Sequence, residues 1–353
     1  VGIIGYFSSR YLLEIMGTSD HLIDLATTYL QIYFLGLPFL MIYNYLSQIM
    51  RAEGDSAMPF FILLISGLFN VAADIAFVAW LKMDVAGVAI ATVISEIISA
   101  ILAILSFFFN KKSYVRLEWK QMRIDNASLK EIVRLGLPAG LQGFFFALPN
   151  VFIQAKLYQV APENKELQDG AIASSNIESY IYAGIEAIYS AAMSFTATNY
   201  GAKKKNSIKK IFFYSMVWNF LFCGVISIIV IFANRQLLGL YVDTEQALIS
   251  GKERLLVVGL TYVLDGVMDI SSGIMRGCRR STFPMISTLI GCTIIRILFL
   301  ETLFNLPYFH TVGWLYSVYP ISWALTSIAN IIAMVCILKK VNIELASKEK
   351  KAI

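Results

Sequence analysis

The sequence predicts an all-α, polytopic membrane protein made of two helical lobes that repeat each other in the same direction. Three observations predict this fold class. The 353-residue chain is 58% hydrophobic and only 15% charged, with a mean hydropathy of +0.67, whereas soluble domains average about 45–50% apolar and about 25% charged residues. Long apolar runs alternate with short polar connectors, and one set of residues recurs at a fixed offset along the chain.

The apolar runs place the helices, because crossing the hydrocarbon layer takes roughly 20 apolar residues of helix. We expect ten membrane helices, the first one incomplete, at 1–16, 26–50, 58–81, 85–109, 132–157, 170–199, 211–233, 254–275, 283–306 and 312–338. The only long connector is basic and polar and follows the fourth run. It predicts an N-terminal lobe over 1–110, a linker over 111–130, a six-helix C-terminal lobe over 131–340 and a tail over 341–353.

The basic residues indicate the orientation in the membrane. Of the 29 Lys and Arg residues, 21 lie in one set of alternate connectors and the C-terminal tail, 7 lie on the opposite side, and Arg296 lies inside a run. Cytoplasmic loops carry such an excess of basic residues. We therefore expect a multi-pass protein of the plasma membrane with a cytoplasmic linker and C-terminus. The net charge of +5 then reflects topology and predicts no nucleic-acid partner.

An internal repeat relates the two lobes at an offset of 225 residues. Ile-Met-Arg51-Ala-x-x-x-Ser-x-x-Pro59 recurs as Ile-Met-Arg276-Gly-x-x-x-Ser-x-x-Pro284. Six predicted helices separate equivalent positions, so both units run in the same direction, an arrangement found in secondary transporters. The counterpart of the six-helix second lobe would begin about a hundred residues before the first residue of this chain. We therefore expect a parent protein of twelve spans, two of which precede this sequence.

Several functional classes are excluded by what the sequence lacks. The four cysteines show no metal-ligand spacing, the two histidines fall in different connectors, and no phosphate-binding loop, dinucleotide fingerprint or nucleophile elbow occurs. These absences argue against an enzyme, a bound cofactor and transport driven by nucleotide hydrolysis within the chain.

Polar residues inside the first-lobe runs suggest a cation site, because an Asp in the bilayer centre costs about 2.5–3.5 kcal/mol on insertion scales. Asn70 and Asp74 lie one helical turn apart, and Thr92 lies in the next run. An amide oxygen, a carboxylate and a hydroxyl can hold a small cation such as Na⁺ near Asp74, or Asp74 can carry a proton. The alternative is a helix-to-helix hydrogen bond with no role in transport.

The second lobe carries two further sets of candidates. Asp265 and Asp269 are spaced one turn apart, one helix from Arg296. Two ionised carboxylates so close together are unfavourable in a low dielectric, so either one of them is protonated, or the pair is neutralised by Arg296 or by a bound cation. A static salt bridge with Arg296 is the alternative. A second set could line a substrate cavity or only bond to neighbouring helices; it consists of Gln142, Asn150, Gln154 and Glu178.

Two prolines inside apolar runs are candidate hinges. Pro38 and Pro138 each follow a Gly-Leu dipeptide. Each removes one backbone hydrogen bond and so weakens its helix locally. In a static bundle the same prolines would be tolerated irregularities.

The sequence resembles the multidrug and toxic compound extrusion (MATE) transporters over its whole length. The residues that carry the resemblance are Gly36-Leu-Pro38, Arg51-Ala-Glu-Gly54-Asp55, Pro59, Asn70-x-x-x-Asp74 and Gly87-Val-Ala-Ile-Ala91-Thr92 in the first lobe, and Gly136-Leu-Pro138-Ala, Asn199-Tyr-Gly201-Ala202, Arg276-Gly277 and Pro284 in the second. The resemblance implies a fold of twelve helices in two lobes. It also implies that this chain extends from the third of these helices to the twelfth.

The resemblance also implies functional residues. In one branch of the family, an Asp of the first helix binds the coupling cation together with an Asn, an Asp and a Thr of the first lobe. The last three match Asn70, Asp74 and Thr92, and the first-helix Asp is expected in the segment that precedes this sequence. In another branch the cation site lies in the second lobe. Its Asp matches Asp265, but the position of its Glu is Phe146 here, which favours the first lobe as the coupling site.

These features predict a secondary active antiporter, acting as a monomer, that exchanges H⁺ or Na⁺ for bulky, often cationic organic compounds by alternating access. The main alternative is a lipid-linked oligosaccharide flippase of the same superfamily, which would need cationic residues in its cavity. A channel or a non-transporting membrane scaffold is a further alternative, but it leaves the intramembrane carboxylates without a purpose.

Overall fold

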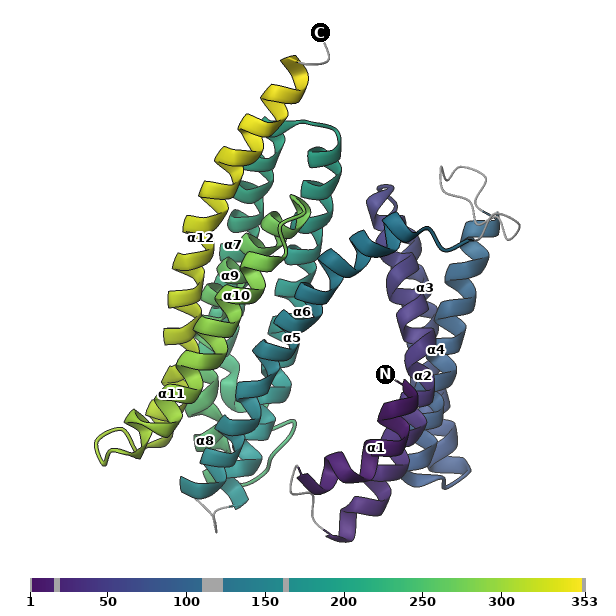
Figure 1. Cartoon of the computed structure of the whole chain (residues 1–353). Coiled ribbons are helices and arrows are strands. Elements are labelled where there is room, and N and C mark those ends of the chain that lie inside the picture. The colour runs from purple at the N-terminus through teal and green to yellow at the C-terminus, as the bar shows by residue number, and fades with distance from the viewer. Residues whose placement is uncertain (1, 16–19, 110–122, 161–164, 351–353) are drawn as a thin grey trace. The chain divides into compact units, whose positions relative to one another are not determined.

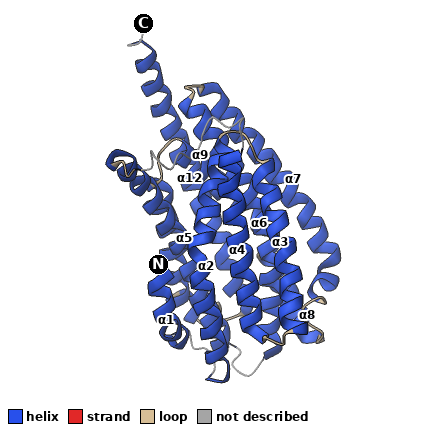
Figure 2. Ribbon diagram, turned by 90° about the vertical axis from the view of Figure 1, so that its right-hand side faces the viewer, coloured by secondary structure: helices blue, strands red, loops and turns tan. Residues whose placement is uncertain are grey.

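The computed structural model describes residues 2–15, 20–109, 123–160 and 165–350, and these residues form helices and no strands (Figures 1 and 2). The predicted all-α class is therefore confirmed. The chain divides into two compact units, Val1–Arg123 and Ile124–Ile353. The division falls within the predicted linker, of which residues 111–122 lie outside the described part.

The first unit contains four helical segments. They are α1 (Gly2–Ile15), α2 (Asp20–Ala52), α3 (Ala57–Ile75) with a π-helical turn η1 (Ala76–Trp80) at its end, and α4 (Asp84–Phe109). Helix α2 packs against α1 and α4, and α3 packs against α4. The core between them is formed by Tyr43, Met50, Ile62, Ala103 and Phe107.

The second unit contains six helical segments, some of them interrupted. Four of them are single helices, α5 (Asn126–Val160), α6 (Lys165–Gly201), α7 (Lys205–Leu238) and α12 (Val312–Lys350). The fifth consists of α8 (Glu245–Val257), the 3₁₀ turn η3 (Gly259–Thr261) and α9 (Tyr262–Gly277). The sixth consists of α10 (Thr282–Thr288), the π-helical η4 (Leu289–Ile294), α11 (Ile295–Glu301) and the 3₁₀ turn η5 (Leu303–Asn305). Helix α6 is the centre of the unit, because it packs against α7, α8 and α9.

Two predicted boundaries were wrong. Helix α5 begins at Asn126, inside the predicted linker, because the carboxylate of Asp125 accepts a hydrogen bond from the backbone N–H of Ser128 at 2.8 Å and caps the helix. Hydrogen bonds from Ser128 lower the pKa of Asp125. Helix α12 continues to Lys350, so the predicted tail from 341 is mostly the end of the last helix.

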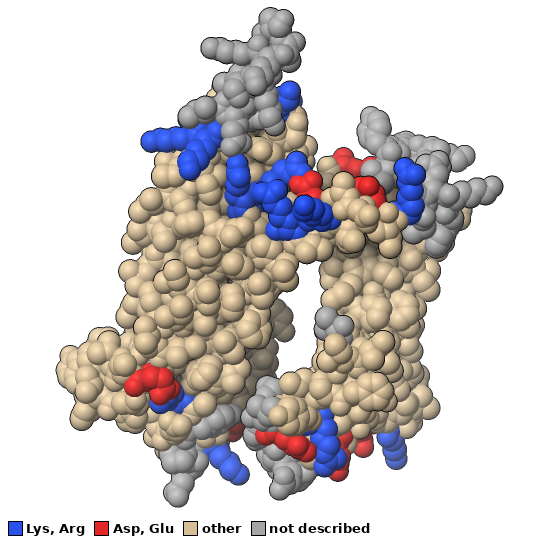
Figure 3. Space-filling model, in the orientation of Figure 1, with Lys and Arg blue, Asp and Glu red and all other residues tan. Residues whose placement is uncertain are grey.

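The outer surface of each unit is that of a membrane protein. Figure 3 shows Lys, Arg, Asp and Glu at the two ends of each unit and an uncharged band between them. Large apolar side chains such as Phe60, Ile65 and Trp218 are exposed, and a soluble monomer avoids exposing so many of them together. Within the residues that the structure describes, eight helical segments are long and apolar enough to span a membrane.

The internal repeat extends to the ends of the helices. Helix α2 ends at Ala52 and α3 begins at Ala57, and 225 residues later α9 ends at Gly277 and α10 begins at Thr282. Both turns contain a residue with positive φ at the same place, Gly54 (92°) and Arg279 (62°). The equivalent hydrogen bonds are present, from Asp55 N to Met50 O at 3.0 Å and from Arg280 N to Met275 O at 3.0 Å. The repeated sequence therefore encodes one helix-ending turn twice.

A glycine contact holds α6 against α8. A Cβ atom at Gly170 would lie 2.2 Å from the carbonyl oxygen of Ala247 and 2.8 Å from the backbone nitrogen of Gly251. Backbone atoms cannot rotate away, so the two helices would have to separate to admit a methyl group.

Gly170→Ala is therefore expected to lower the free energy of unfolding by about 1–3 kcal/mol, the usual cost of overpacking. The measurement is thermal or denaturant unfolding of the purified protein in detergent. Gly224→Ala in α7 is the matched control, because no atom lies within 4 Å of its added methyl group. Equal stability of both variants would contradict the close approach of α6 and α8.

Candidate functional site

The first unit carries the predicted cation ligands on two packed helices. Asn70 and Asp74 lie one turn apart on α3, immediately before the π-helical turn η1, and Thr92 lies on α4. All three are partly buried. Asn70 Nδ2 and Asp74 Oδ1 are buried and have no hydrogen-bond partner among the described residues. The Thr92 hydroxyl donates to the carbonyl oxygen of Val88 at 3.0 Å, which leaves its lone pairs available.

Unsatisfied buried polar atoms cost free energy, and a native structure retains them for a reason. The carboxylate of Asp74 offers an oxygen with no internal donor, and π-helical turns often occur at functional sites. The region provides carboxylate, amide and hydroxyl oxygens, which are the ligands that small hard cations prefer. It can accept a proton or a metal cation.

Glu96 is a further buried carboxyl of this unit that sequence reasoning missed. It lies on α4, one turn after Thr92, and is 8% exposed. A signal was present in the sequence, because Glu96 is the only charged residue between 85 and 109.

In the second unit, the predicted cavity residue Glu178 is one partner of a buried ion pair. Arg254 donates from Nε and Nη2 to the two carboxylate oxygens of Glu178 at 2.8 and 2.9 Å, and the side chains are 8% and 4% exposed. Ser174 donates to the same carboxylate at 2.9 Å. The guanidinium group of Arg254 also faces the rings of Tyr316 and Tyr319, 5.4 and 5.8 Å from their centroids.

This ion pair lies on the wall of a cavity of about 300 Å³. Asn150 and Gln154 of α5, two further residues of the predicted substrate-cavity set, also line the cavity. Tyr319 donates a hydrogen bond to the Asn150 side-chain oxygen at 3.0 Å. The remaining walls are largely aromatic and include Phe146, Tyr182, Tyr262 and Trp323. Such a mixture of ring faces and a few polar groups suits flat organic molecules.

The fourth residue of the predicted set, Gln142, lies in a different cavity. This cavity of about 210 Å³ is also lined by Glu186, Asp269 and Arg276, and it shares Phe146 and Tyr182 with the first cavity. Arg276 donates to the side-chain oxygen of Gln142 at 2.6 Å and also donates to the hydroxyl of Tyr189.

The predicted partners Asp265, Asp269 and Arg296 lie close enough for Asp265 to interact electrostatically with both of the others. Asp265 is fully buried, and neither of its carboxylate oxygens has a hydrogen-bond partner in the described part of the chain. Asp269 lines the smaller cavity instead. No ion pair joins Arg296 to either carboxylate within the described residues, so the predicted static salt bridge is absent.

Arg296 is held by aromatic rings. It is fully buried, donates from Nε to the Ser322 hydroxyl at 2.8 Å, and lies 4.6 to 5.8 Å from the ring centroids of Phe146, Tyr319 and Trp323. Its two terminal nitrogens have no hydrogen-bond partner among the described residues. Cation–π contacts therefore surround the guanidinium group, which also interacts electrostatically with Asp265.

Both predicted hinges lie inside continuous helices, Pro38 in α2 and Pro138 in α5. Neither proline can donate a backbone hydrogen bond, so each helix is locally weakened.

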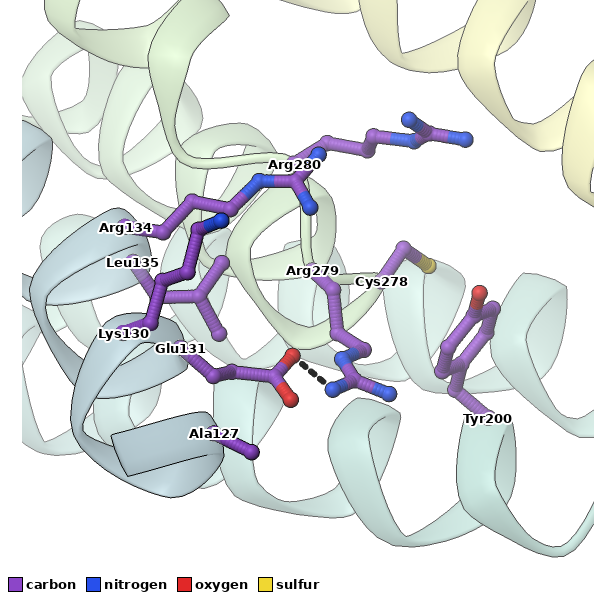
Figure 4. A pocket seen from close by; sticks show the side chains of 9 residues that line it. All are labelled: Ala127, Lys130, Glu131, Arg134, Leu135, Tyr200, Cys278, Arg279 and Arg280. Atoms are coloured by element: carbon purple, nitrogen blue, oxygen red, sulfur yellow. Dashed lines mark ion pairs between the residues drawn. The ribbon is translucent and has the colours of Figure 1, made fainter. Parts of the chain in front are cut away.

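A basic pocket of about 450 Å³ lies at one end of the second unit (Figure 4). Lys130 and Arg134 of α5 and Arg279 and Arg280 of the turn before α10 surround it, and Glu131 pairs with Arg279. These exposed cations belong to the basic connectors that the sequence assigns to the cytoplasm.

Comparisons with known proteins agree on one family. The MatE family profile matches residues 1–76 and 169–302. The chain is 24% identical over 293 residues to the probable multidrug resistance protein YoeA of Bacillus subtilis, covering 81% of this chain and 62% of the relative. It is 27% identical over 301 residues to the probable multidrug resistance protein YpnP of the same organism, covering 84% and 65%. The chain thus spans less than two thirds of the length of these relatives.

Solved structures share the fold. A MATE structure in the bent conformation aligns with 98% of this chain and 76% of its own, at 18% identity and a TM-score of 0.84. A MOP superfamily transporter from Pyrococcus furiosus aligns with 96% and 76%, at 18% identity and a TM-score of 0.85. On the matched profile and the shared fold, this chain belongs to the MATE family, whose members are membrane transporters and not enzymes.

Proposed function

We propose that the protein is a secondary active efflux antiporter that exchanges H⁺ or Na⁺ for bulky, often cationic organic compounds. It works as a monomer in the plasma membrane, with its C-terminus in the cytoplasm. The names of relatives such as YoeA, YpnP and the multidrug export protein MepA support drug-like substrates.

The observation that carries the coupling proposal is the partly buried carboxylate of Asp74, one oxygen of which is shielded from solvent. Its Oδ1 atom and the neighbouring Asn70 Nδ2 lack partners in the described part of the chain. A buried carboxylate without a partner is costly, and a cation bound at Asp74 with Asn70 and Thr92 removes this cost. Binding energy that differs between the outward-facing and inward-facing states then drives the transition.

The flippase alternative is less well supported. A pyrophosphate-bearing substrate needs uncompensated cations in the cavity. Of the basic side chains there, Arg254 is paired with Glu178, and Arg276 shares its cavity with Glu186 and Asp269.

The test is transport by the full-length protein reconstituted in liposomes. A fluorescent lipophilic cation is followed under an imposed pH gradient and then under a Na⁺ gradient. If the protein is an antiporter, the pH gradient or the Na⁺ gradient drives the substrate against its own concentration gradient. The ion whose gradient drives this flux is the coupling ion. Flux under neither gradient would contradict the proposal and favour a lipid-linked substrate.

A further inference from the structure

Glu96 is enclosed by a neighbouring helix rather than by water. A Cβ atom added to Gly36 of α2 would lie only 2.2 Å from Glu96 Oε2 and 2.9 Å from Cγ2 of Val93. The carboxyl group therefore occupies the space that a side chain at position 36 would fill. Glu96 Oε2 is buried and has no hydrogen-bond partner among the described residues.

Among the residues that the structure describes around Glu96, none is a cation that could balance a negative charge. Helix α4 packs against α2, α3 and η1. The titratable side chains near this level are Tyr29 and Tyr33 on the Gly36 face of α2 and Asp74 on α3, while η1 carries none. The basic residue Arg51 lies 15 positions after Gly36 on α2, or about 22 Å along the helix axis. A buried carboxyl without a cationic partner is stable only when it is neutral.

The helix that encloses Glu96 is also the one with a built-in weak point. Pro38 lies two residues after Gly36 and cannot donate to the carbonyl oxygen of Phe34. Bending of α2 at Pro38 would move Gly36 relative to α4 and change the access of water to Glu96.

We propose that Glu96 is a proton-binding site of the first unit, distinct from Asp74, whose occupancy depends on the packing of α2 at Gly36. While α2 is packed against α4, the carboxyl group holds a proton. When α2 moves away, water reaches the group, the O–H bond breaks and the proton passes to solvent. Protonation then favours the packed state and deprotonation the open one. The proton site itself does not depend on the proposed antiport function. Only its effect on transport rests on that function.

The first experiment detects the proton directly. Infrared difference spectra of the purified full-length protein between acid and alkaline buffer are compared for the wild type, Glu96→Gln and the control Glu14→Gln. Glu14 is an exposed carboxylate of α1 in an ion pair with Arg10. We expect a protonated-carboxyl band that titrates in the wild type and in the control and is missing in Glu96→Gln. Presence of every band in Glu96→Gln would overturn the proposal.

The second experiment measures the consequence for transport in liposomes. Glu96→Gln is expected to weaken the pH dependence of substrate flux and to reduce flux driven by a pH gradient on the order of tenfold, within the usual range for coupling between sites. Glu14→Gln should behave as the wild type. Unchanged pH dependence in Glu96→Gln would contradict the inference while leaving antiport itself intact. If the infrared band is lost in Glu96→Gln but the wild type shows no gradient-driven flux, the proposed antiport function is contradicted and the proton site at Glu96 is retained.

Gly36→Ala provides a test that keeps the carboxyl group. The added methyl group displaces Glu96 from its enclosure, so the infrared titration midpoint of the carboxyl should move to lower pH. Gly67→Ala in α3, with no atom within 4 Å of its added methyl group, should leave the midpoint unchanged. In a Glu96→Gln background Gly36→Ala should have no further effect on the spectrum. A midpoint unaffected by Gly36→Ala would show that α2 does not control the proton.

Discussion

Asp74→Asn is expected to abolish the cation-driven component of substrate transport. The substitution retains the size of the side chain but removes the negative charge, so neither a proton nor Na⁺ can be exchanged at this position. Because only the differential binding of the ion to the two states supplies free energy, the variant should still bind substrate without concentrating it. The measurement is uptake of a fluorescent lipophilic cation into liposomes under the gradient that drives the wild type.

The matched control is Asp84→Asn. Asp84 is an exposed residue of the same unit and the first residue of α4, so it undergoes the same chemical change at the very end of a span. It should transport as the wild type does. Near-normal gradient-driven flux in Asp74→Asn would show that the coupling site is elsewhere, with Asp265 and Asp269 as the next candidates.

Substitution of the neutral ligands separates the two coupling ions. If Na⁺ binds, Asn70→Ala and Thr92→Ala each remove an oxygen ligand and should raise the Na⁺ concentration needed for half-maximal transport. If only a proton binds, these oxygens are not ligands and Thr92→Ala should have little effect. The comparison requires no assumption about the substrate.

The sequence predicted the helices and the repeat because both depend on local features. The hydropathy of each run requires a helix in lipid, where every backbone polar group needs an internal partner. The Arg, Ser and Pro of the repeat mark a helix end, the position before the next helix and the start of that helix. These fall at Ala52, Ser56 and Ala57 in one unit and 225 residues later in the other, and neither serine side chain caps its helix.

Irregularities inside the spans were not predictable in this way. The π-helical segments η1 and η4 and the 3₁₀ turn η3 lie in apolar sequence that is equally compatible with regular helix. Tertiary contacts determine them. In η4, for example, the Thr293 hydroxyl donates to the carbonyl oxygen of Phe145 in α5.

The candidate sites were predictable as residue types but not as partners. Polar residues inside apolar runs identified Asp74, Asp265 and Glu178. Arg254, the partner of Glu178, is 76 positions away. In the sequence it is one of the seven basic residues on the side opposite the predicted cytoplasmic side, and nothing there indicates a buried partner. Arg296 lies close enough to Asp265 to interact with it electrostatically, as expected, but its guanidinium group contacts aromatic rings and forms no salt bridge with that carboxylate in the described residues. The sequence does not show which neighbouring helix a side chain faces.

Removal of one partner of the buried pair Glu178–Arg254 is expected to cost much more stability than any exposed change. Glu178→Ala leaves the guanidinium group of Arg254 buried at 8% exposure, without its two carboxylate acceptors. Breaking a buried ion pair in this way typically lowers the free energy of unfolding by about 3–5 kcal/mol. Denaturant unfolding in detergent measures the loss.

An exposed pair on neighbouring segments provides the matched control. Arg235 and Glu245 form an ion pair at 2.6 Å, but their side chains are 68% and 60% exposed. Glu245→Ala should therefore cost less than about 1 kcal/mol, because water solvates the remaining charge. A similar loss in both glutamate variants would show that the Glu178–Arg254 pair is solvated and not buried.

The double variant Glu178→Leu/Arg254→Met distinguishes the cost of an unpaired charge from the value of the pair itself. Replacement of both partners by apolar residues leaves no buried charge, and such changes are often neutral for stability. We expect the double variant to be more stable than Glu178→Ala, although it loses the charges on the cavity wall. Substrate binding that weakens in this stable double variant would mean that the pair is retained for recognition. Stability below that of Glu178→Ala would mean that the ion pair itself stabilises the contact between α6 and α8.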